Sequence, residues 1–338
     1  MRVLIADNLE SEGVQALERL GCTVMLEPSI KAEELPGRLG KGDAEVLIVR
    51  SKKVPRAAIE ESKNLRAIIR AGAGVDNIDS EAATERGIGV CNCPGMNSVA
   101  VAELTLGLII ACDRRITDQT AAIKAHRWDK KGFSGGAHGL KGSTLCIVGF
   151  GAIGRAVAHR AAAFEMTVAA WDRHLTPSLA RERGIAFAGS SREELLAFLP
   201  QCDVASVHLA LTPETRKFCD AEFFARMKRG ATFINTARGD VVDEAAMCRA
   251  ATERGLRLGL DVYENQPAGS GVEFVTPVAP LTGAFTHHCG ASTDQSQRAV
   301  ADETVRIVQV FMETGRLENC VNASALASRS PASAARSR

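Results

Sequence analysis

A glycine-rich hexapeptide constrains the fold of this chain more than any other segment. Residues 149 to 154 read Gly-Phe-Gly-Ala-Ile-Gly and lie between a buried-strand pattern (144–148) and a helical pattern (153–163). In such a loop, Gly149 allows a tight turn, Gly151 lets the backbone approach a pyrophosphate, and Gly154 lets the helix pack closely on its strand. The N-terminus of the helix attracts the phosphates. The order of strand, glycines and helix therefore predicts a dinucleotide-binding fold.

An acidic residue at the end of the next predicted strand indicates which dinucleotide is bound. Asp172 follows the strand pattern 168–171 and lies 18 residues beyond Gly154. A carboxylate at this place accepts hydrogen bonds from the ribose hydroxyls and repels a 2′-phosphate. We therefore expect NAD as the cofactor, although Arg173 and His174 follow the acid and would tolerate the phosphate of NADP.

The composition excludes several classes of function. The 338 residues are 46% hydrophobic and 24% charged, which is typical of a globular protein with room for two domains. Lys and Arg total 41 against 40 acidic residues, so no global field recruits nucleic acid or an anionic membrane. Ten cysteines without paired zinc spacing are typical of reduced thiols, and the longest apolar stretch, 104–112, is half of a membrane span. We expect a cytoplasmic protein without metal, nucleic-acid or membrane binding.

Short apolar runs alternate with helical patterns along most of the chain. This alternation is typical of α/β proteins, and it occurs once before and once after the glycine loop, so we expect two doubly wound parallel sheets. The predicted strands before the loop are 3–6, 23–26, 46–49, 67–69 and 89–91, and those from the loop onward are 144–148, 168–171, 204–207, 232–234 and 258–260.

The position of the loop predicts the domain organisation. A dinucleotide fold normally opens with its glycine loop, and a helical pattern at 293–311 would carry the chain back to the first domain. We expect residues 1–97 plus 289–322 to form a substrate domain, residues 98–288 to form the dinucleotide domain, and a cleft to lie between them. The tail 323–338 has no acid and no apolar periodicity, so we expect it to be disordered.

A polar, glycine-containing arm separates the long helical pattern 98–112 from the glycine loop. It contains Trp128 and Phe133, which are either a satellite of the core or a contact between two subunits. It also contains three cations, Arg127, Lys130 and Lys131, which either bind a phosphate or form a solvated surface. The sequence leaves both questions open.

Taken in order, the motifs of the chain resemble the D-2-hydroxyacid dehydrogenase family, most closely its 3-phosphoglycerate dehydrogenase branch without a regulatory domain. The resemblance covers about residues 1–322. Besides the glycine loop it rests on Val49-Arg-Ser51, Arg70-Ala-Gly-Ala-Gly-Val-Asp-Asn77, Asn92-Cys-Pro94, Asn97-Ser98, Ala102-Glu103, Asn235-Thr-Ala-Arg-Gly239, Leu260-Asp-Val262 and His288-Cys-Gly-Ala-Ser-Thr293.

The resemblance implies a fold and an activity. The fold is a flavodoxin-like substrate domain beside a Rossmann NAD domain. The activity is NAD-dependent oxidation of a small D-2-hydroxy acid to the 2-oxo acid. The branch implies a phosphorylated substrate, 3-phospho-D-glycerate, which is oxidised to 3-phosphohydroxypyruvate for serine biosynthesis, and a homodimer.

Two residues carry the expected chemistry. Arg238 follows the strand pattern 232–234, at the edge where doubly wound sheets bind ligands, and a guanidinium there grips a carboxylate and polarises the adjacent carbonyl. His288 is the candidate general acid-base, because hydroxy-acid oxidation removes a proton from the hydroxyl and imidazole titrates near neutrality. His287 is adjacent, and only the resemblance of the segment that follows favours His288.

The chain departs from the family at Gln266. The family carries a glutamate there, which pairs with the catalytic histidine. An amide carbonyl orients an imidazole N–H without stabilising imidazolium by charge. Formate dehydrogenases of the same broad family carry glutamine at this position, and their hydride transfer needs no acid-base proton. A formate dehydrogenase-like reaction therefore stays open.

The resemblance also implies the binding residues. Those expected to bind substrate are Arg50, Ser51, Arg70, Gly74, Val75 and Asn97. Those expected to bind cofactor are Gly149, Gly151, Ala152, Ile153, Gly154, Asp172, His208, Leu209, Thr236, Ala237, Arg238, Asp261, His288 and Gly290.

Two further functions stay open at this stage. One is reduction of glyoxylate or hydroxypyruvate, which differs from the first hypothesis in needing no substrate phosphate. The other is an NAD(H)-sensing binding protein with weak catalysis, of the kind that shares this fold.

Overall fold

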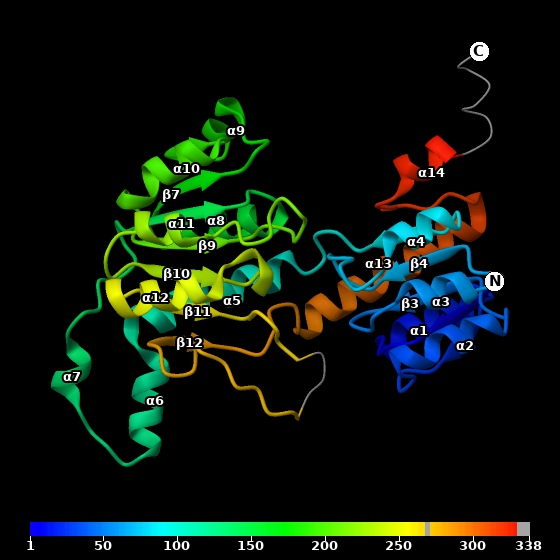
Figure 1. Ribbon diagram of the computed structural model, residues 1–338, viewed down its shortest axis with the longest axis horizontal. Helices are drawn as coiled ribbons and strands as arrows, with labels where there is room; N and C mark the ends of the chain where they lie inside the picture. Colours follow the sequence, from blue (N-terminus) through cyan, green and yellow to red (C-terminus); the bar gives the residue numbers. More distant parts are fainter. Residues whose placement is uncertain (268–270, 330–338) are drawn as a thin grey trace. The chain divides into compact units, whose positions relative to one another are not determined.

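The computed structural model describes residues 1–267 and 271–329, which divide into two compact units (Figure 1). The first unit is Met1–Asn97 together with the segment that begins at Thr293, and the second is Ser98–Ser292. Each unit contains one parallel sheet, so the prediction of two parallel-sheet α/β domains is confirmed.

The first unit is built on five parallel strands in the order β2-β1-β3-β4-β5. The central strands β3 and β4 are apolar and buried on both faces, as a sheet covered by helices on both sides requires. The strands are β1 (Arg2–Ile5), β2 (Thr23–Leu26), β3 (Val46–Val49), β4 (Ala67–Arg70) and β5 (Gly89–Asn92). The helices are α1 (Ser11–Arg19), η1 (Ala32–Glu34), α2 (Leu35–Gly40), α3 (Arg56–Glu61), α4 (Ser80–Glu85), α13 (Asp294–Thr314) and α14 (Ala323–Arg329).

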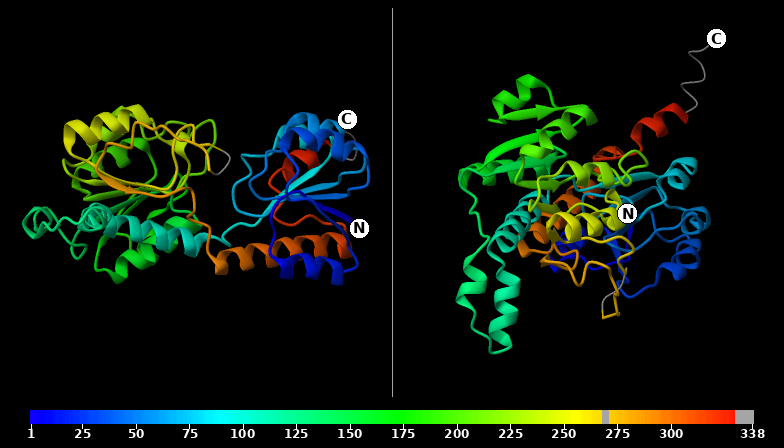
Figure 2. Two further views of the ribbon diagram at one scale, coloured as in Figure 1. Left: turned by 90° about the horizontal axis from the view of Figure 1, so that it is seen from below. Right: turned by 60° about the vertical axis from the view of Figure 1, so that its left-hand side comes forward.

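Helices cover the two faces of this sheet. Helices α1 and α13 pack together, although most of the chain separates them in sequence, and α2 packs on α3. Figure 2 shows α1 and α13 on one face and α2, α3 and α4 on the opposite face. The return helix α13 therefore completes the first unit.

The second unit is built on seven parallel strands in the order β12-β11-β10-β9-β6-β7-β8. The strands are β6 (Thr144–Val148), β7 (Thr167–Trp171), β8 (Phe187–Gly189), β9 (Val204–Val207), β10 (Thr232–Asn235), β11 (Arg257–Leu260) and β12 (Gly283–Phe285). The sequence patterns missed β8 and β12, which are three-residue strands at the two edges of the sheet. Such strands are too short for an alternation pattern to be recognised.

The helices of the second unit also lie on both sides of its sheet (Figure 2). Helices α5 (Ser98–Arg114) and α8 (Ala152–Ala163) pack together on one face. The others are α6 (Ile116–Lys124), α7 (Lys130–Ser134), α9 (Pro177–Glu182), α10 (Arg192–Phe198), η2 (Leu199–Gln201), α11 (Ala221–Arg226), η3 (Gly239–Val241) and α12 (Glu244–Arg254). Phe223, Phe224 and Phe233 meet edge to face under α11 with centroids 5.0 to 6.1 Å apart.

The arm of residues 113–142 contains α6 and α7 (Figure 1). Phe133 lies under the guanidinium of Arg115, with 4.7 Å between Cζ and the ring centroid. Trp128 is 82% exposed, which suits a contact with a second subunit.

The prediction that the tail is disordered from Ala323 onward is wrong for residues 323–329, which form α14. Three alanines favour a helix there, and Asn322 anchors the segment that precedes it. The Asn322 side chain accepts from the backbone N–H of Val90 and donates to Thr84 and to the carbonyl of Ile88. Residues 330–338 lie outside the described part of the chain.

Within the described ranges 1–267 and 271–329, the apolar length needed to cross a membrane is reached by none of the helices.

Candidate active site

The glycine loop joins β6 to α8 at the carboxyl edge of the sheet in the second unit. Gly149 has φ of 100°, and a Cβ there would lie 2.8 Å from the carbonyl oxygen of His208. A Cβ on Gly154 would lie 2.2 Å from the carbonyl oxygen of Gly149. Packing within the protein therefore requires glycine at both positions.

Gly151 differs, because a Cβ built on it meets no described atom of the protein within 4 Å. Packing within the chain does not demand glycine there, so the residue suits the close approach of a group from outside. Helix α8 begins at Ala152, and the N–H groups of Ala152 and Ile153 have no acceptor inside the helix. Gly151 and the N–H groups of Ala152 and Ile153 together form a cradle that fits a pyrophosphate.

Asp172 ends β7 beside this loop. One carboxylate oxygen accepts from the N–H of Phe150 at 2.9 Å, and the other accepts from the N–H of His174 at 2.9 Å. Each oxygen keeps a second lone pair. The carboxylate is thus held in place by the backbone and still suits the two hydroxyls of a ribose.

His208 follows β9 and adjoins Gly149 through its carbonyl group. Its Nε2 lies 2.9 Å from the hydroxyl of Ser206, whereas its buried Nδ1 has no hydrogen-bond partner among the described residues. Burial lowers the pKa of His208 to about 3, so the ring is neutral at physiological pH. A neutral ring with an unpaired Nδ1 suits a contact with a bound nucleotide.

Asp261 organises the segment that carries the candidate catalytic histidine. The residue is 1% exposed, and its backbone N–H donates to the carbonyl of Asn235. Its carboxylate accepts from the hydroxyl of Thr286 at 2.6 Å and from the N–H groups of Cys289 and Gly290 at 2.9 Å each. The sequence predicted a nicotinamide contact for Asp261, and this bracing of residues 286–290 is an additional role that it did not predict.

His288 has a strained backbone. Its φ is 53°, in the left-handed region that costs a non-glycine residue on the order of 1 kcal/mol or more. Its N–H donates to the carbonyl of Asp261 at 2.6 Å, and its two successors donate to the Asp261 carboxylate. The surroundings therefore determine this conformation, as is common for residues at functional sites.

Gln266 contacts the ring of His288, as the resemblance predicted for this position. Its Nε2 lies 2.5 Å from Nδ1 of His288, while its Oε1 accepts from the N–H of Tyr263 at 3.1 Å. The sequence predicted the amide carbonyl against the ring, and the structure instead has the amide nitrogen there. The reversed amide would set two donors against each other at Tyr263, so the backbone determines the orientation.

This orientation of the Gln266 amide favours one of the two tautomers of the His288 imidazole. An amide N–H donates, so Nδ1 of His288 accepts and the neutral ring carries its proton on Nε2. A glutamate would accept from Nδ1–H and leave Nε2 as the base. With the amide in this orientation, the His288 tautomer that accepts at Nδ1 carries its proton on Nε2.

Arg238 is held by the turn that follows β10. The Asn235 side chain accepts from the N–H of Ala237 and donates to the carbonyl of Arg238, each at 2.9 Å. Nη1 of Arg238 donates to the carbonyl of Ala237 at 2.7 Å. Thr236, inside the same turn, lies with its hydroxyl 3.0 Å from the hydroxyl of Thr105 on α5. The turn is therefore tied to the strand and to a covering helix.

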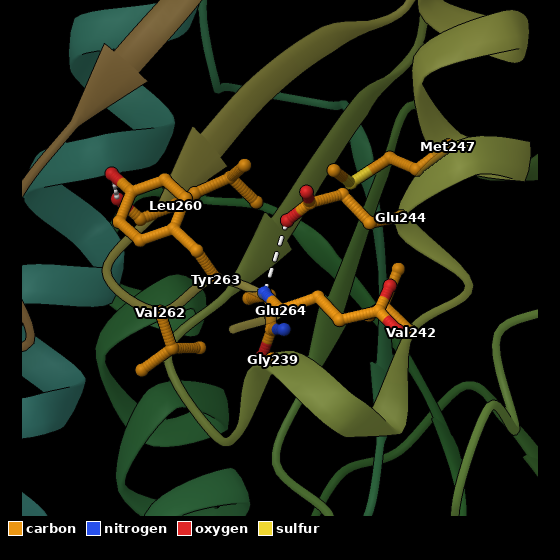
Figure 3. A pocket seen from close by; sticks show the side chains of 9 residues that line it. Gly239, Val242, Glu244, Met247, Leu260, Val262, Tyr263 and Glu264 are labelled. Atoms are coloured by element: carbon orange, nitrogen blue, oxygen red, sulfur yellow. Dashed lines mark hydrogen bonds between the residues drawn. The ribbon is translucent and has the colours of Figure 1, made fainter. Parts of the chain in front are cut away.

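A small pocket lies behind this turn (Figure 3). Glu244 is 8% exposed and accepts from the N–H of Glu264 at 3.0 Å, and burial raises the pKa of Glu244. A Cβ on Gly239 would lie 2.0 Å from the carbonyl oxygen of Tyr263, so the two loops touch. The Glu264 carboxylate lies 3.6 Å from Nζ of Lys217.

In the first unit, the predicted substrate residues Arg50 and Ser51 follow β3. Asp7, which the sequence analysis did not single out, accepts from the N–H groups of Arg50, Ser51 and Lys52 at 2.8 to 3.0 Å. Nη1 of Arg50 donates to the side chain of Gln297 on α13. A sequence signal for Asp7 existed, since it directly follows the first predicted strand.

Arg70 ends β4, and its Nε donates to the carbonyl of Arg50 at 2.9 Å. Gly72 has φ of 153°, and a Cβ there would lie 1.8 Å from Nη1 of Arg70. The guanidinium therefore lies over a glycine, and the loops after β3 and β4 are joined.

The loop after β4 offers backbone donors. Within the described residues, we find no protein acceptor for the N–H groups of Gly74 and Val75. The Asn92 side chain donates to the carbonyl of Ala73, which holds this loop against β5. The buried Oδ1 of Asn97 has no partner among the described residues. Two cations, two amide donors and an amide side chain thus belong to the first unit.

The remaining predicted cofactor residues lie on the second unit. The side chain of Leu209 is 3.1 Å from the position that a Cβ on Gly149 would take, and Gly290 donates to Asp261. The sequence analysis missed the supporting residues Asn235, Glu244 and Tyr263, because only their contacts with distant segments reveal them.

Comparison with known proteins gives one family. The sequence model described as "D-isomer specific 2-hydroxyacid dehydrogenase, NAD binding domain" matches residues 106–284. The chain is 37% identical over 325 residues to D-3-phosphoglycerate dehydrogenase of Methanocaldococcus jannaschii, covering 95% of this chain and 59% of that protein. It is 37% identical over 317 residues to hydroxypyruvate reductase of Thermotoga maritima, covering 93% of this chain and 98% of that protein.

A solved structure extends the comparison. The NAD-dependent formate dehydrogenase from Staphylococcus aureus, in complex with NAD, superimposes with a TM-score of 0.78 at 27% identity, covering 94% of this chain and 98% of that one. The chain thus spans nearly the whole reductase and formate dehydrogenase, and 59% of the Methanocaldococcus jannaschii protein.

Proposed function

The chain belongs to the D-isomer specific 2-hydroxyacid dehydrogenase family, and we propose that it oxidises 3-phospho-D-glycerate to 3-phosphohydroxypyruvate with NAD. The observation that carries the proposal is the set of anion-binding groups in the first unit. Arg50 directly follows β3, Arg70 ends the neighbouring strand β4, and the amides of Gly74 and Val75 come after β4. Such a set suits an acid with more than one anionic group.

NAD is the cofactor of this proposal. Ala152 and Ile153 would bind the pyrophosphate, Asp172 the adenosine ribose, and His208 and Leu209 the adenine side. The nicotinamide residues would be Thr236, Ala237, Arg238, Asp261, His288 and Gly290. NAD, when bound, accepts the hydride of the substrate.

Arg238 binds the substrate carboxylate in this proposal. A guanidinium donates two parallel hydrogen bonds to a carboxylate and stabilises the charge that develops on the neighbouring oxygen. The turn built by Asn235 restricts the backbone of Arg238, which reduces the entropy that it loses on binding substrate. In the first unit, the resemblance assigns Gly74, Val75 and Asn97 to carboxylate binding and Arg50, Ser51 and Arg70 to phosphate recognition.

His288 takes the hydroxyl proton in this proposal. For that step the Gln266 amide rotates, so that its oxygen accepts from Nδ1–H and Nε2 becomes the base. The rotation breaks the hydrogen bond that the N–H of Tyr263 donates to the Gln266 amide oxygen. It places the amide nitrogen against that N–H instead, at a cost of about 1–3 kcal/mol. We infer that proton transfer is slower than with a glutamate at position 266.

A second candidate is oxidation of formate, which the Gln266 contact specifically favours. An Nε2–H donor on His288 and the Arg238 guanidinium suit the two oxygens of formate, and the reaction requires no proton transfer to the histidine. A solved relative is an NAD-dependent formate dehydrogenase. The two cations of the first unit have no comparable use with so small a substrate.

Two other candidates are separable by the same assay. Reduction of hydroxypyruvate or glyoxylate is supported by the reductase of Thermotoga maritima and would proceed without a substrate phosphate. An NAD(H)-sensing protein would bind the dinucleotide and turn over none of these acids.

The test is NAD reduction with 3-phospho-D-glycerate, D-glycerate and formate, and NADH oxidation with hydroxypyruvate and glyoxylate. We expect kcat/KM for 3-phospho-D-glycerate to exceed that for D-glycerate at least tenfold. Equal values would contradict the phosphate assignment and favour the reductase. Turnover of formate alone would favour the second candidate, and dinucleotide binding without turnover would favour the sensor.

We also propose a homodimer that uses the arm around Trp128. Trp128→Ser should lower the sedimentation coefficient toward that of a monomer. An unchanged coefficient would contradict a contact through this residue.

A further inference from the structure

The C-terminal segment of the first unit pairs with the edge strand β5. The N–H of Val321 donates to the carbonyl of Val90 at 2.8 Å, and the N–H of Asn92 donates to the carbonyl of Asn319 at 3.3 Å. These two bonds run between antiparallel strands and flank the pair Cys91 and Cys320, which form an antiparallel bridge. The two cysteines therefore lie directly opposite each other.

The register of this bridge suits a disulfide. Because the hydrogen bonds lie on either side of the pair, Cys91 and Cys320 occupy a non-hydrogen-bonded position, where opposite Cα atoms are about 4.5 Å apart. A disulfide requires Cα atoms about 4.4–6.8 Å apart. The backbone is thus already in the geometry that the bond needs.

The side chains share one face of β5. Gly89 and Cys91 point to the same side of the strand because they are two residues apart. A Cβ on Gly89 would lie 3.5 Å from Sγ of Cys320. Both cysteines belong to the same apolar cluster of the first unit, so the two sulfur atoms face the same space.

The two thiols are chemically unequal. A hydrogen bond between them lowers the pKa of Cys320 to about 6 and raises the pKa of Cys91. Cys320 is partly buried, whereas Cys91 is fully buried. Sγ of Cys320 also donates to Oδ1 of Asn322 at 3.1 Å. Because Cys320 is the more exposed of the two, it is the sulfur that a small oxidant reaches, and Cys91 is the thiol that follows.

We propose that Cys91 and Cys320 form a reversible disulfide when the protein meets a peroxide. The Cys320 thiolate attacks hydrogen peroxide, its sulfur gains one oxygen as a sulfenic acid, and hydroxide leaves. The Cys91 sulfur then attacks the Cys320 sulfur, and the sulfenic oxygen leaves as water with the Cys91 proton. The two thiols lose two electrons, and one peroxide becomes two molecules of water.

The disulfide would fasten the C-terminal segment to β5, the edge strand beside the loop that contains Gly74 and Val75. β5 continues through Asn92, whose side chain holds Ala73 beside Gly74 and Val75. In the reduced protein, two backbone hydrogen bonds and the side-chain bonds of Asn322 hold this edge, and a disulfide adds a covalent constraint to them. The oxidised protein should therefore keep this edge paired at temperatures that open the reduced one.

The first test is mass spectrometry after hydrogen peroxide treatment of the full chain and alkylation of the remaining thiols. Trypsin should release residues 87–114 linked to residues 317–329, and dithiothreitol should separate them. The cross-link should be absent in Cys91→Ser and in Cys320→Ser. It should remain in Cys93→Ser, a buried neighbour in the same peptide whose Sγ contacts the Thr304 hydroxyl instead.

The second test is thermal unfolding before and after peroxide treatment. Oxidation should raise Tm by at least about 3 °C in the parent protein and leave Tm of Cys320→Ser unchanged. Matching circular dichroism of the reduced proteins would show that both variants fold. The proposal is overturned if the parent protein forms no cross-link, or if the same peptides stay linked in Cys91→Ser.

Discussion

The side-chain nitrogen of Gln266 lies 2.5 Å from Nδ1 of His288, because the amide oxygen is engaged by the backbone N–H of Tyr263. The contact makes Nδ1 an acceptor and leaves the proton of the neutral ring on Nε2. Hydroxy-acid oxidation needs the opposite tautomer, and formate oxidation does not. One substitution therefore separates the two candidate functions.

Gln266→Glu should raise kcat for oxidation of 3-phospho-D-glycerate by about tenfold or more, because a carboxylate accepts from Nδ1–H and frees Nε2 as the base. The same change should lower formate oxidation, since it removes the Nε2–H donor and adds a negative charge. Steady-state rates between pH 6 and 9 measure both. Gln201→Glu, an exposed glutamine in η2, is the matched control and should change neither rate.

Arg238→Lys should lower kcat/KM for the preferred acid by about 100-fold, because a lysine offers no planar pair of donors to a carboxylate. Arg216→Lys is the control, since Arg216 is exposed and pairs with Asp240 in the same region. Steady-state kinetics and Tm of both variants make the comparison. A comparable loss in both would mean that the effect does not arise from carboxylate recognition.

Two glycines of the same loop should respond differently to alanine. Gly151→Ala should unfold with a free energy within about 1 kcal/mol of the parent and bind NAD at least tenfold more weakly, because its Cβ meets no described protein atom. Gly154→Ala should lose about 3 kcal/mol, because its Cβ overlaps the carbonyl of Gly149. Denaturant unfolding measures the stability of the two variants, and titration measures their affinity for NAD. Unchanged NAD affinity in Gly151→Ala would contradict the binding of pyrophosphate at Gly151.

Asp172→Asn should shift cofactor preference toward NADP by at least about tenfold. The amide keeps one acceptor oxygen for the backbone but removes the charge that repels a 2′-phosphate. The ratio of the two dissociation constants, measured by fluorescence titration, gives the shift. An unchanged ratio would mean that the adjacent Arg173 and His174 determine the preference.

His208 should make stability depend on pH. Its pKa is lowered to about 3 by burial, from an ordinary value of 6.5. The neutral ring thus contributes stability above pH 6.5, which is lost as the pH falls from 6.5 toward 3. His208→Gln should reduce the loss of unfolding free energy between pH 6.5 and 4.5 by about 2 kcal/mol, a value discounted for partial exposure. Identical pH profiles by urea unfolding would contradict the assignment.

The sequence was sufficient for elements whose pattern is local. The strands 46–49 and 144–148 are continuous apolar runs, and each is buried on both faces as predicted. The glycine loop was predictable because it lies between a strand pattern and a helix pattern and Gly149 takes a positive φ, and Asp172 follows from its place after a strand. These features depend on neighbours within a few residues, so the one-dimensional pattern contains them.

The tertiary structure decided what depends on distant partners. The short edge strands β8 and β12 exist through pairing with β7 and β11, and α14 follows an anchor, Asn322, that is bound to β5. The sequence predicted that Gln266 faces His288, but only the backbone N–H of Tyr263 determines which end of the amide does so. Likewise, ten scattered cysteines predicted reduced thiols, and only the register across β5 sets Cys91 opposite Cys320. Hydrogen-bond direction and strand register depend on groups that are far apart in the chain. The composition and the spacing of residues therefore do not predict them.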